Sequence, residues 1–226
     1  MRFVRYTYSM FGSIVIVVRI LRKHSIVYGG ERVDKLEKHI RRLLELIGED
    51  PNDPELVETP RRIADMYRDF LKFKDVDPRV YLRRKLPTTH RELVMVRDIE
   101  FFSLCKHHLM PFFGKVHIAY IPHDYIVGLS KFWSLVQAYA HRLQIQETLT
   151  KQIADVIMQE LRPFGVMVVC EAIHTCMYIR GRYDFSINSR TMAKTVTSAI
   201  RGVFEWNPSA KQEVLSLLQI SEKEVT

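Results

Sequence analysis

Cysteine, glycine and proline are all scarce in this sequence. Its 226 residues include 3 cysteines, 9 glycines and 9 prolines. An odd number of cysteines excludes a scaffold built on disulfides and fits a reducing compartment, where thiols are available as metal ligands or nucleophiles. Hydrophobic residues make up 47% and charged residues 27%, which excludes a disordered, collagen-like or low-complexity chain. The length allows one or two domains.

A hydrophobic run long enough to cross a bilayer is missing as well. The uncharged stretch from Tyr6 to Val18 is too short for a span and is stopped by Arg19. It has the basic start and apolar middle of a signal peptide, but it lacks an A-x-A-like cleavage site, and the need for reduced cysteines argues against export. We therefore expect a cytoplasmic protein without a membrane partner.

Acidic residues are absent from the first 30 positions. This arm contributes five of the eight net positive charges, which leaves +3 for the other 196 residues. Such a distribution does not support a nucleic-acid footprint over the whole domain, and no DNA- or RNA-binding pattern accompanies it. We interpret residues 1–30 as a basic and apolar arm: an extra strand, a disordered segment or sequence upstream of the true start, with membrane-surface contact as the alternative.

Hydrophobic periodicity predicts an α+β fold with an antiparallel sheet backed by helices. Thr59 is the expected N-cap of the second helix and Ser130 that of the third. We expect a helical region over 31–90 and a catalytic domain over 91–226. The predicted helices are 32–47, 59–72, 130–142, 146–161 and 208–219, and the predicted strands are 92–104, 115–121, 166–180 and 195–204.

Three residues form a candidate metal site. Cys105 and His108 have C-x-x-H spacing on a loop between predicted strands, and Cys176 lies in the long predicted strand. A period of two would put Cys176 on the same strand face as His174. Two cysteines and one histidine leave a fourth position open for water, which is the pattern of a catalytic zinc site. Zinc is favoured over Fe(II) without excluding it.

The alternative is a metal-free core. Free cysteines are commonly small buried hydrophobes, and a two-ligand motif with a distant cysteine can arise by coincidence. Cys170 shares the strand face but is interpreted as a packing residue.

Several short motifs occur together in chain order between about Val33 and Leu218, and with them the sequence resembles GTP cyclohydrolase I. The motifs are Glu58-Thr59-Pro60-Arg61-Arg62, Cys105-Lys106-His107-His108, Ala119-Tyr120-Ile121-Pro122, Gly128-Leu129-Ser130-Lys131, Gln144-Ile145-Gln146-Glu147, His174-Thr175-Cys176-Met177, Arg180-Gly181 and Thr195-Val196-Thr197-Ser198-Ala199.

The resemblance implies the tunnelling fold, with an antiparallel four-stranded sheet and helices packed on one side. Subunits of that family form barrel-like pentamers, and two pentamers stack into a homodecamer with active sites between subunits. Closure of the sheet across subunits would also remove exposed strand edges.

The resemblance also implies a reaction. Zinc held by Cys105, His108 and Cys176 activates water for attack on the purine C8 of GTP. His107 protonates the imidazole-ring nitrogen and His174 is a second proton carrier. Formate leaves, and the ribose rearranges and closes to 7,8-dihydroneopterin triphosphate, the first step of pterin and folate-type biosynthesis. Alternatively, His107 orients the ligand loop and His174 supports a metal ligand.

The substrate contacts that the resemblance implies come from other motifs. Glu147 holds the guanine with help from Gln146, and Ser130 lies near the sugar. The family's phosphate positions retain three basic residues here, namely Arg62, Lys131 and Arg180.

Two other phosphate positions depart from the family pattern, because Asp65 and Ser134 replace basic residues. This is a deficit for binding a triphosphate, which is held by charge-assisted bonds. Lys106 in place of a glutamate could offset it, as could a longer segment before Thr195 that brings Arg182, Arg190 and Lys194. The alternatives are a related purine or pterin substrate with fewer phosphates, or a non-catalytic nucleotide-binding paralogue.

Overall fold

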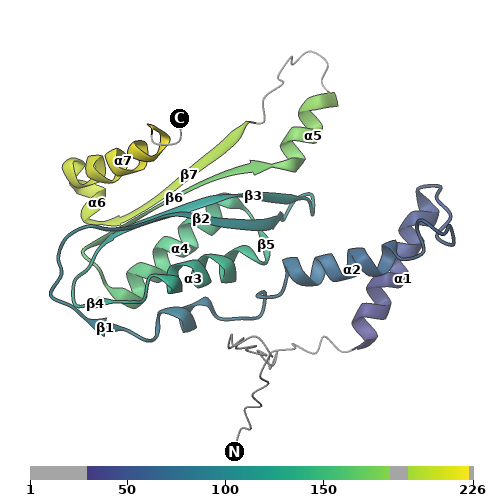
Figure 1. Cartoon of the computed structure of the whole chain (residues 1–226), viewed down its shortest axis with the longest axis horizontal. Coiled ribbons are helices and arrows are strands. Elements are labelled where there is room, and N and C mark those ends of the chain that lie inside the picture. The colour runs from purple at the N-terminus through teal and green to yellow at the C-terminus, as the bar shows by residue number, and fades with distance from the viewer. Residues whose placement is uncertain (1–29, 184–192, 224–226) are drawn as a thin grey trace, which may run out of the picture.

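The computed structural model describes residues 30–183 and 193–223 (Figure 1). The interpretation of residues 1–30 as an N-terminal arm therefore falls outside the described residues, and so does most of the longer segment before Thr195. No helix in the described ranges combines the length and apolarity that a membrane crossing requires.

The described part of the chain starts with a helical hairpin that projects from the rest of the molecule (Figure 1). Its helices are α1 (Gly30–Leu46) and α2 (Thr59–Phe70), close to the predicted ranges. The N-cap of α2 is Glu58, one residue earlier than expected, and Pro60 occupies the first turn, where its missing N–H leaves no intrahelical bond unmade. Phe70 contacts Phe102 edge to face, with ring centroids 5.1 Å apart, and so joins the hairpin to the sheet.

The main sheet has five strands in the order β5-β2-β3-β6-β7. The expected four antiparallel strands are present, and a short fifth strand, β5, pairs in parallel with the end of β2. A two-residue ladder has no periodicity that a sequence could show. The strands are β2 (Val94–Cys105), β3 (Pro111–Ile121), β5 (Leu143–Gln144), β6 (Gly165–His174) and β7 (Lys194–Gly202).

Both outer edges of this sheet are largely open. Within residues 30–183 and 193–223, β7 has no partner on its outer side and β2 pairs there only with β5. The connections outside the sheet are η1 (Pro78–Leu82) and a separate two-stranded sheet of β1 (Leu86–Pro87) and β4 (Tyr125–Ile126).

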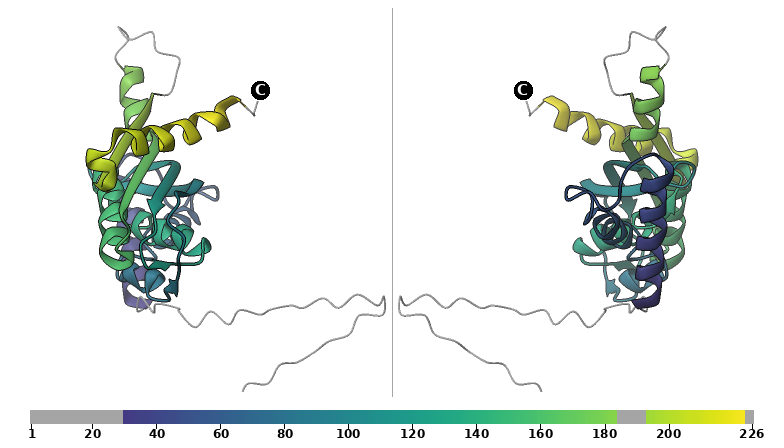
Figure 2. Two further views of the ribbon diagram at one scale, coloured as in Figure 1. Left: turned by 90° about the vertical axis from the view of Figure 1, so that its left-hand side faces the viewer. Right: turned by 90° about the vertical axis from the view of Figure 1, so that its right-hand side faces the viewer.

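Helices cover both faces of the sheet, which corrects the expectation of helices on one side (Figures 1 and 2). One face packs against α3 (Ser130–Ala140) and α4 (Gln146–Leu161). Its core includes the fully buried side chains of Phe112, Leu135 and Ile153.

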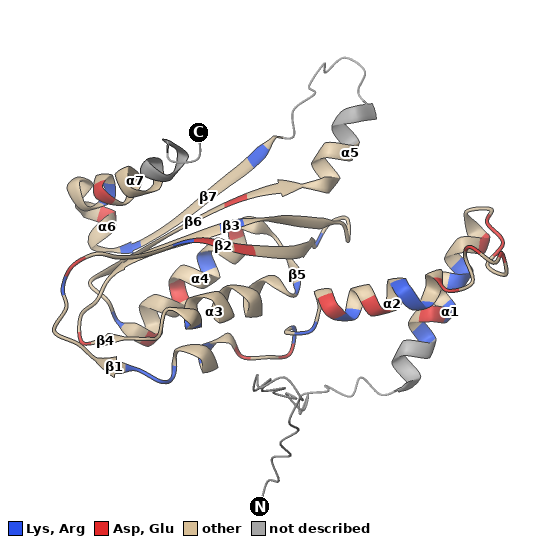
Figure 3. Ribbon diagram, in the orientation of Figure 1, with Lys and Arg blue, Asp and Glu red and all other residues tan. Residues whose placement is uncertain are grey.

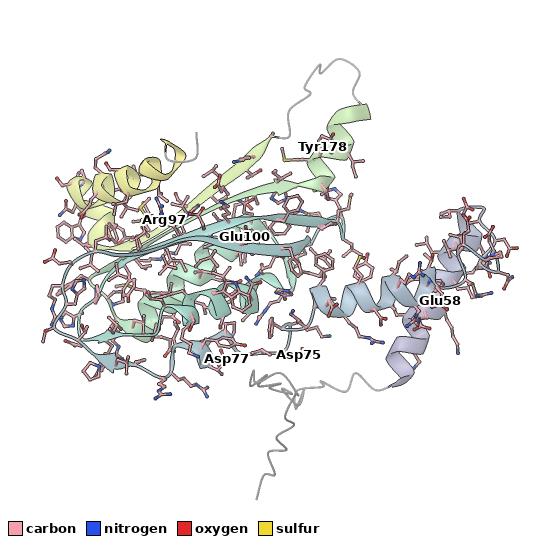
Figure 4. The ribbon with its side chains drawn as sticks, in the orientation of Figure 1. Glu58, Asp75, Asp77, Arg97, Glu100 and Tyr178 are labelled. Atoms are coloured by element: carbon pink, nitrogen blue, oxygen red, sulfur yellow. The ribbon has the colours of Figure 1, made fainter. Side chains whose placement is uncertain are left out.

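The opposite face is covered only at one end. There α6 (Val203–Trp206) and α7 (Pro208–Lys223) form a smaller core around Phe204 and Val214. Arg97 on β2 donates from its guanidinium to the Leu217 carbonyl at 2.6 Å, which ties α7 to the sheet (Figure 4).

The predicted strand over 166–180 is too long. β6 ends at His174 and the chain continues as α5 (Thr175–Tyr183). At the transition the Thr175 hydroxyl donates to the Pro111 carbonyl at 2.6 Å, which fixes the start of α5 against β3. Cys176 therefore lies in the first turn of a helix, and the period-of-two argument does not apply to it.

Candidate functional site

Cys105, His108 and Cys176 come together at one end of the sheet. Their donor atoms all lie within 4.8 Å of one another. The two sulfur atoms are 4.0 Å apart, and the Cys105 sulfur is 3.7 Å from His108 Nδ1. Metal–sulfur bonds of about 2.3 Å and metal–nitrogen bonds of about 2.0 Å at tetrahedral angles separate the donors by about 3.5–3.8 Å. The residues present therefore fit a zinc ion with one open position.

A tight turn presents the first two donors. Cys105 is the last residue of β2, and its N–H donates to the Met110 carbonyl at 2.8 Å. Its carbonyl accepts from Leu109 N–H at 2.9 Å, and Leu109 has a φ of 55°, a left-handed conformation that closes the turn. His108 lies within this turn and is exposed.

The two thiols are buried, each with 6% exposure. Burial raises the pKa of the Cys176 thiol, and the neighbouring Cys105 raises it further. A nearby positive charge, such as a divalent cation supplies, would favour the thiolate of Cys176 against this effect. The electrostatics and the spacing therefore favour the same kind of occupant.

His174 is the last residue of β6 and precedes Cys176 by two residues in the sequence. Its ring stacks on Phe112 with 4.5 Å between centroids and an interplanar angle of 5°. Its Nε2 lies 2.8 Å from the Gln146 side-chain oxygen. Burial lowers the pKa of His174, and the nearby Glu147 carboxylate opposes that change. Stacking on Phe112 thus fixes the plane of the His174 ring, and the contact with Gln146 fixes the rotation of the ring within that plane.

Gln146 is a buried residue, with 1% exposure. The two hydrogens on its Nε2 are shared among the Cys170 carbonyl at 3.0 Å, the Thr195 carbonyl at 2.9 Å and the Thr197 hydroxyl at 3.2 Å. The amide nitrogen is thus engaged inside the protein, and the expected contact of this side chain with guanine stays a prediction. Glu147, the next residue, is exposed.

The other expected proton-transfer residue, His107, is exposed in the same turn as His108, with 6.2 Å between the ring centroids. The structure thus brings His107 and the three donors to one end of the sheet, the end where β6 also places His174.

The other expected substrate residues lie elsewhere in the chain. Ser130 is exposed and Lys131 is half-buried in the first turn of α3, whose last turn leads into β5 and Cys105. An 11-residue helix spans about 16 Å, so these residues lie one helix length from the end of α3 that leads to β5. Arg62 is exposed on α2, in the projecting hairpin. The backbone of Arg180 is in α5, and its side chain lies outside the described residues.

The departures from the family pattern have local partners. Asp65 forms an ion pair with Arg68 at 3.1 Å on α2, a helix of mixed charge (Figure 3). The Ser134 hydroxyl donates to the Ser130 carbonyl at 3.2 Å, one helical turn back. Lys106 is exposed in the ligand turn. Neither Asp65 nor Ser134 supplies a cation, and the phosphate-binding deficit expected at these two positions stays a prediction.

Residues to which the sequence analysis assigned no role complete the site. Phe112 supports the His174 ring, and Thr197 supports Gln146. Phe112 pairs with His174 in the β3–β6 ladder. Identifying Phe112 from the sequence would have required knowledge of the register between β3 and β6.

A cavity of about 650 Å³ is lined by residues of the sheet and of α3. Its lining includes Phe102, Phe113, Glu100 and Trp133. The strand alternation that puts Phe112 in the core puts Phe113 at this cavity. Cys105, His108 and Cys176 are not among the residues that line it.

Comparison with known proteins gives a consistent result. The family model for GTP cyclohydrolase I matches residues 36–219. The chain is 48% identical over 188 residues to GTP cyclohydrolase 1 of Desulforamulus reducens, which covers 83% of this chain and 97% of that relative. It is 47% identical over 186 residues to GTP cyclohydrolase 1 of Geobacillus kaustophilus (82% and 96% covered) and 46% identical over 187 residues to that of Clostridioides difficile (82% and 95%).

Among solved structures, the apo form of an archaeosine synthase QueF-Like protein aligns with a TM-score of 0.36 at 17% identity, over 47% of this chain and 92% of that one. That likeness is too low to bear on the fold.

Proposed function

The chain belongs to the GTP cyclohydrolase I family, and from this premise we propose that it hydrolyses GTP at purine C8 and closes the product to 7,8-dihydroneopterin triphosphate. The observation that carries the proposal is the cluster of two thiols and one imidazole within 4.8 Å, a three-donor set with room for a fourth ligand. We assign the metal to Cys105, His108 and Cys176. When bound, zinc supplies Lewis-acid activation of the water that attacks C8.

The surrounding side chains bind the base and move protons. The exposed Glu147 carboxylate accepts from the guanine ring N–H and exocyclic amine, which is a charge-assisted recognition of that edge. His107, in the ligand turn, donates a proton to the imidazole-ring nitrogen as the ring opens. His174 is the second proton carrier, held by Phe112 and Gln146.

The site is incomplete within one chain, which supports a homo-oligomer. Ser130 and Lys131 begin α3, about 16 Å of helix from the end that leads to β5 and Cys105, so we propose that the α3 of another copy supplies these two residues to the sugar and phosphates. The open outer edges of β2 and β7 are suited to pairing between copies. Two stacked pentamers are the assembly that we propose, in the reducing cytoplasm that free cysteines favour.

The phosphate end of the substrate is where a second candidate arises. Asp65 and Ser134 leave Arg62, Lys131 and Arg180 as the proposed cations, which favours a substrate with fewer phosphates than GTP. Comparing the turnover of GTP, GDP and GMP distinguishes the two candidate substrates, because a site in which other basic residues replace the missing cations prefers the triphosphate.

The test is a turnover assay of the zinc-loaded full-length protein that follows formate and oxidised-pterin fluorescence together. We expect both signals with GTP. Formate without pterin would place the failure at the ribose rearrangement. The absence of both signals from a zinc-loaded oligomer would refute the assignment.

The guanine contact has its own control. Glu147→Gln keeps the size of the side chain and removes its charge, and we expect about a 10–100-fold loss of kcat/KM, because hydrogen bonds to a charged group contribute about 1.5–3 kcal/mol. Glu147→Gln protein should keep its zinc. Unchanged kcat/KM would remove Glu147 from the base-binding site.

A further inference from the structure

We propose that Gln146 is a positioning residue that holds His174 in the tautomer with the proton on Nε2, so that the Nδ1 lone pair is the one presented to substrate. The inference rests on the proposed function for the role of His174 in turnover. Its structural part rests only on the direction of the hydrogen bonds around a buried carboxamide.

The carboxamide of Gln146 can have only one orientation. The two backbone carbonyls of Cys170 and Thr195, at 3.0 and 2.9 Å, can only accept hydrogen bonds. The atom that faces them must therefore be the amide nitrogen. Turning the group over would set its oxygen against two carbonyl oxygens at 1% exposure, where no water relieves the repulsion.

The orientation of the amide then fixes the proton on the histidine. The Gln146 oxygen faces His174 Nε2 at 2.8 Å, and an amide oxygen can only accept. The hydrogen bond is formed only if Nε2 carries the proton. In the neutral ring Nδ1 is then the bare nitrogen, and it has no hydrogen-bond partner among residues 30–183 and 193–223.

A closed ring of hydrogen bonds holds the carboxamide itself. The Thr150 hydroxyl donates to the Gln146 backbone carbonyl at 2.8 Å. Because that hydroxyl has one proton, Thr197 must donate to it across their 2.7 Å contact. The Thr197 oxygen then accepts at 3.2 Å from the Gln146 amide, whose two hydrogens it shares with the two carbonyls. Every direction in the ring agrees, so α4, β6 and β7 jointly determine the amide orientation.

This arrangement gives Gln146 a function that differs from base recognition. During turnover His174 Nδ1 takes a proton from the substrate, which leaves an imidazolium whose Nε2–H remains on the Gln146 oxygen, and the same nitrogen returns the proton. The stacked Phe112 ring keeps the imidazole plane constant. The amide acts through His174 and touches neither metal nor substrate.

The direct experiment is ¹⁵N NMR of histidine-labelled, zinc-loaded protein, in a sample at about pH 8, above the ordinary histidine pKa of about 6.5. A His174→Asn sample identifies the His174 signals by their loss. We expect a single His174 tautomer with the proton on Nε2. A proton on Nδ1 in the wild-type protein would overturn the inference, whatever the turnover assay gives.

The variant that tests the amide is Gln146→Met, which keeps side-chain length and removes both hydrogen-bonding ends. We expect the His174 signals to split between the two tautomers and kcat to fall by about 10–100-fold, as for other residues that orient catalytic groups, with KM within about threefold and zinc content unchanged. Retention of the single Nε2–H tautomer in this variant would overturn the inference, and so would a redistributed tautomer with full kcat.

Thr197→Val is the matched control. It removes two hydrogen bonds from the same buried ring but leaves the oxygen that faces His174, so the tautomer should stay single even if the melting temperature falls as far as in Gln146→Met. A tautomer change of equal size in both variants would mean that general loosening moves the proton, and would overturn the role of Gln146. Absence of GTP turnover in the wild-type protein refutes the proposed function instead, and leaves the NMR result to stand separately.

Discussion

The two faces of the sheet carry different kinds of interaction, although the same strands build both. Phe112 on the face covered by α3 and α4 is fully buried, whereas Phe113, the next residue, has 45% exposure on the other face. The covered face holds the thiols, His174 and Gln146 in fixed orientations. The opposite face, away from α7, carries exposed ion pairs such as Lys194–Glu171. Chemistry that depends on orientation is located where packing fixes each side chain.

The largest predicted effect comes from removing a donor on the covered face. Cys176→Ala should lose most of its zinc and more than about 100-fold in GTP turnover, since losing a ligand exceeds the usual effect of losing a group that supports one. Metal analysis and the formate assay measure the two quantities.

Cys170→Ala is its control on the same face. Cys170 is fully buried, and burial raises the pKa of its thiol to about 12. This variant should keep its zinc and lose about 1–2 kcal/mol of unfolding free energy through the cavity. Equal zinc loss in both variants would contradict the ligand assignment.

The next largest effect is a loss of stability at Gly114, where β3 and β6 approach each other closely. A Cβ at Gly114 would lie 1.9 Å from the Glu171 carbonyl oxygen, so β3 and β6 approach too closely for any side chain there. Gly114→Ala should lower the free energy of unfolding by about 3 kcal/mol or more. Gly128→Ala, where nothing lies within 4 Å, should change it by less than about 0.5 kcal/mol. Similar denaturation midpoints for both would contradict the close approach.

A smaller effect depends on pH. His141 has 2% exposure, and its Nδ1 donates to the Gln137 carbonyl at 2.9 Å. Burial lowers the pKa of His141, and Lys72 lowers it further, whereas the nearby Asp69 opposes this change. The unfolded chain therefore binds the proton more readily. The contribution to stability is complete above about pH 6.5 and is lost as the pH falls through the lowered pKa, with a limiting slope of about 1.4 kcal/mol per pH unit.

His141→Gln isolates that contribution. Urea denaturation between about pH 4 and pH 8 should give a shallower stability profile for the variant than for the wild-type protein, because the titrating group is gone. Parallel profiles would show that His141 is not held neutral by the fold.

The smallest effect is expected on the open face. Lys194→Met removes a partner of Glu171 at 3.5 Å, and the lysine side chain has 61% exposure. We expect a change of less than about 0.5 kcal/mol in unfolding free energy, because exposed ion pairs are screened. A loss above about 1 kcal/mol would mean that this face contributes specific interactions as the covered face does.

Much of the fold could be predicted because the responsible signals are local. Helix α4 has the predicted bounds 146–161, since its apolar period stops before Pro163 and Arg162 adopts the left-handed C-cap. The end of β6 was missed because Cys176 to Ile179 contains residues that suit a strand as well as a helix. What ends the strand is the hydrogen bond from Thr175 to Pro111, a contact between distant segments.

The candidate site divides in the same way. The spacing of Cys105 and His108 is local and identifies a ligand pair. The burial of Gln146 and the stacking of Phe112 depend on which strands pair and in what register, and a single sequence does not specify these. Ser130 and Lys131 illustrate a third limit, because the part of the site that they are proposed to complete belongs to another copy of the chain.

The order of the strands also sets a sequence of events in time. Cys105 and His108 belong to the β2–β3 hairpin, a local unit that can form early, whereas Cys176 lies 71 residues beyond Cys105 and arrives only after β6 has paired with β3. An ion captured by the first two donors alone is weakly held and exchanges. In the proposed set, the choice of metal is therefore made when the second half of the sheet docks, at the end of folding rather than at its start.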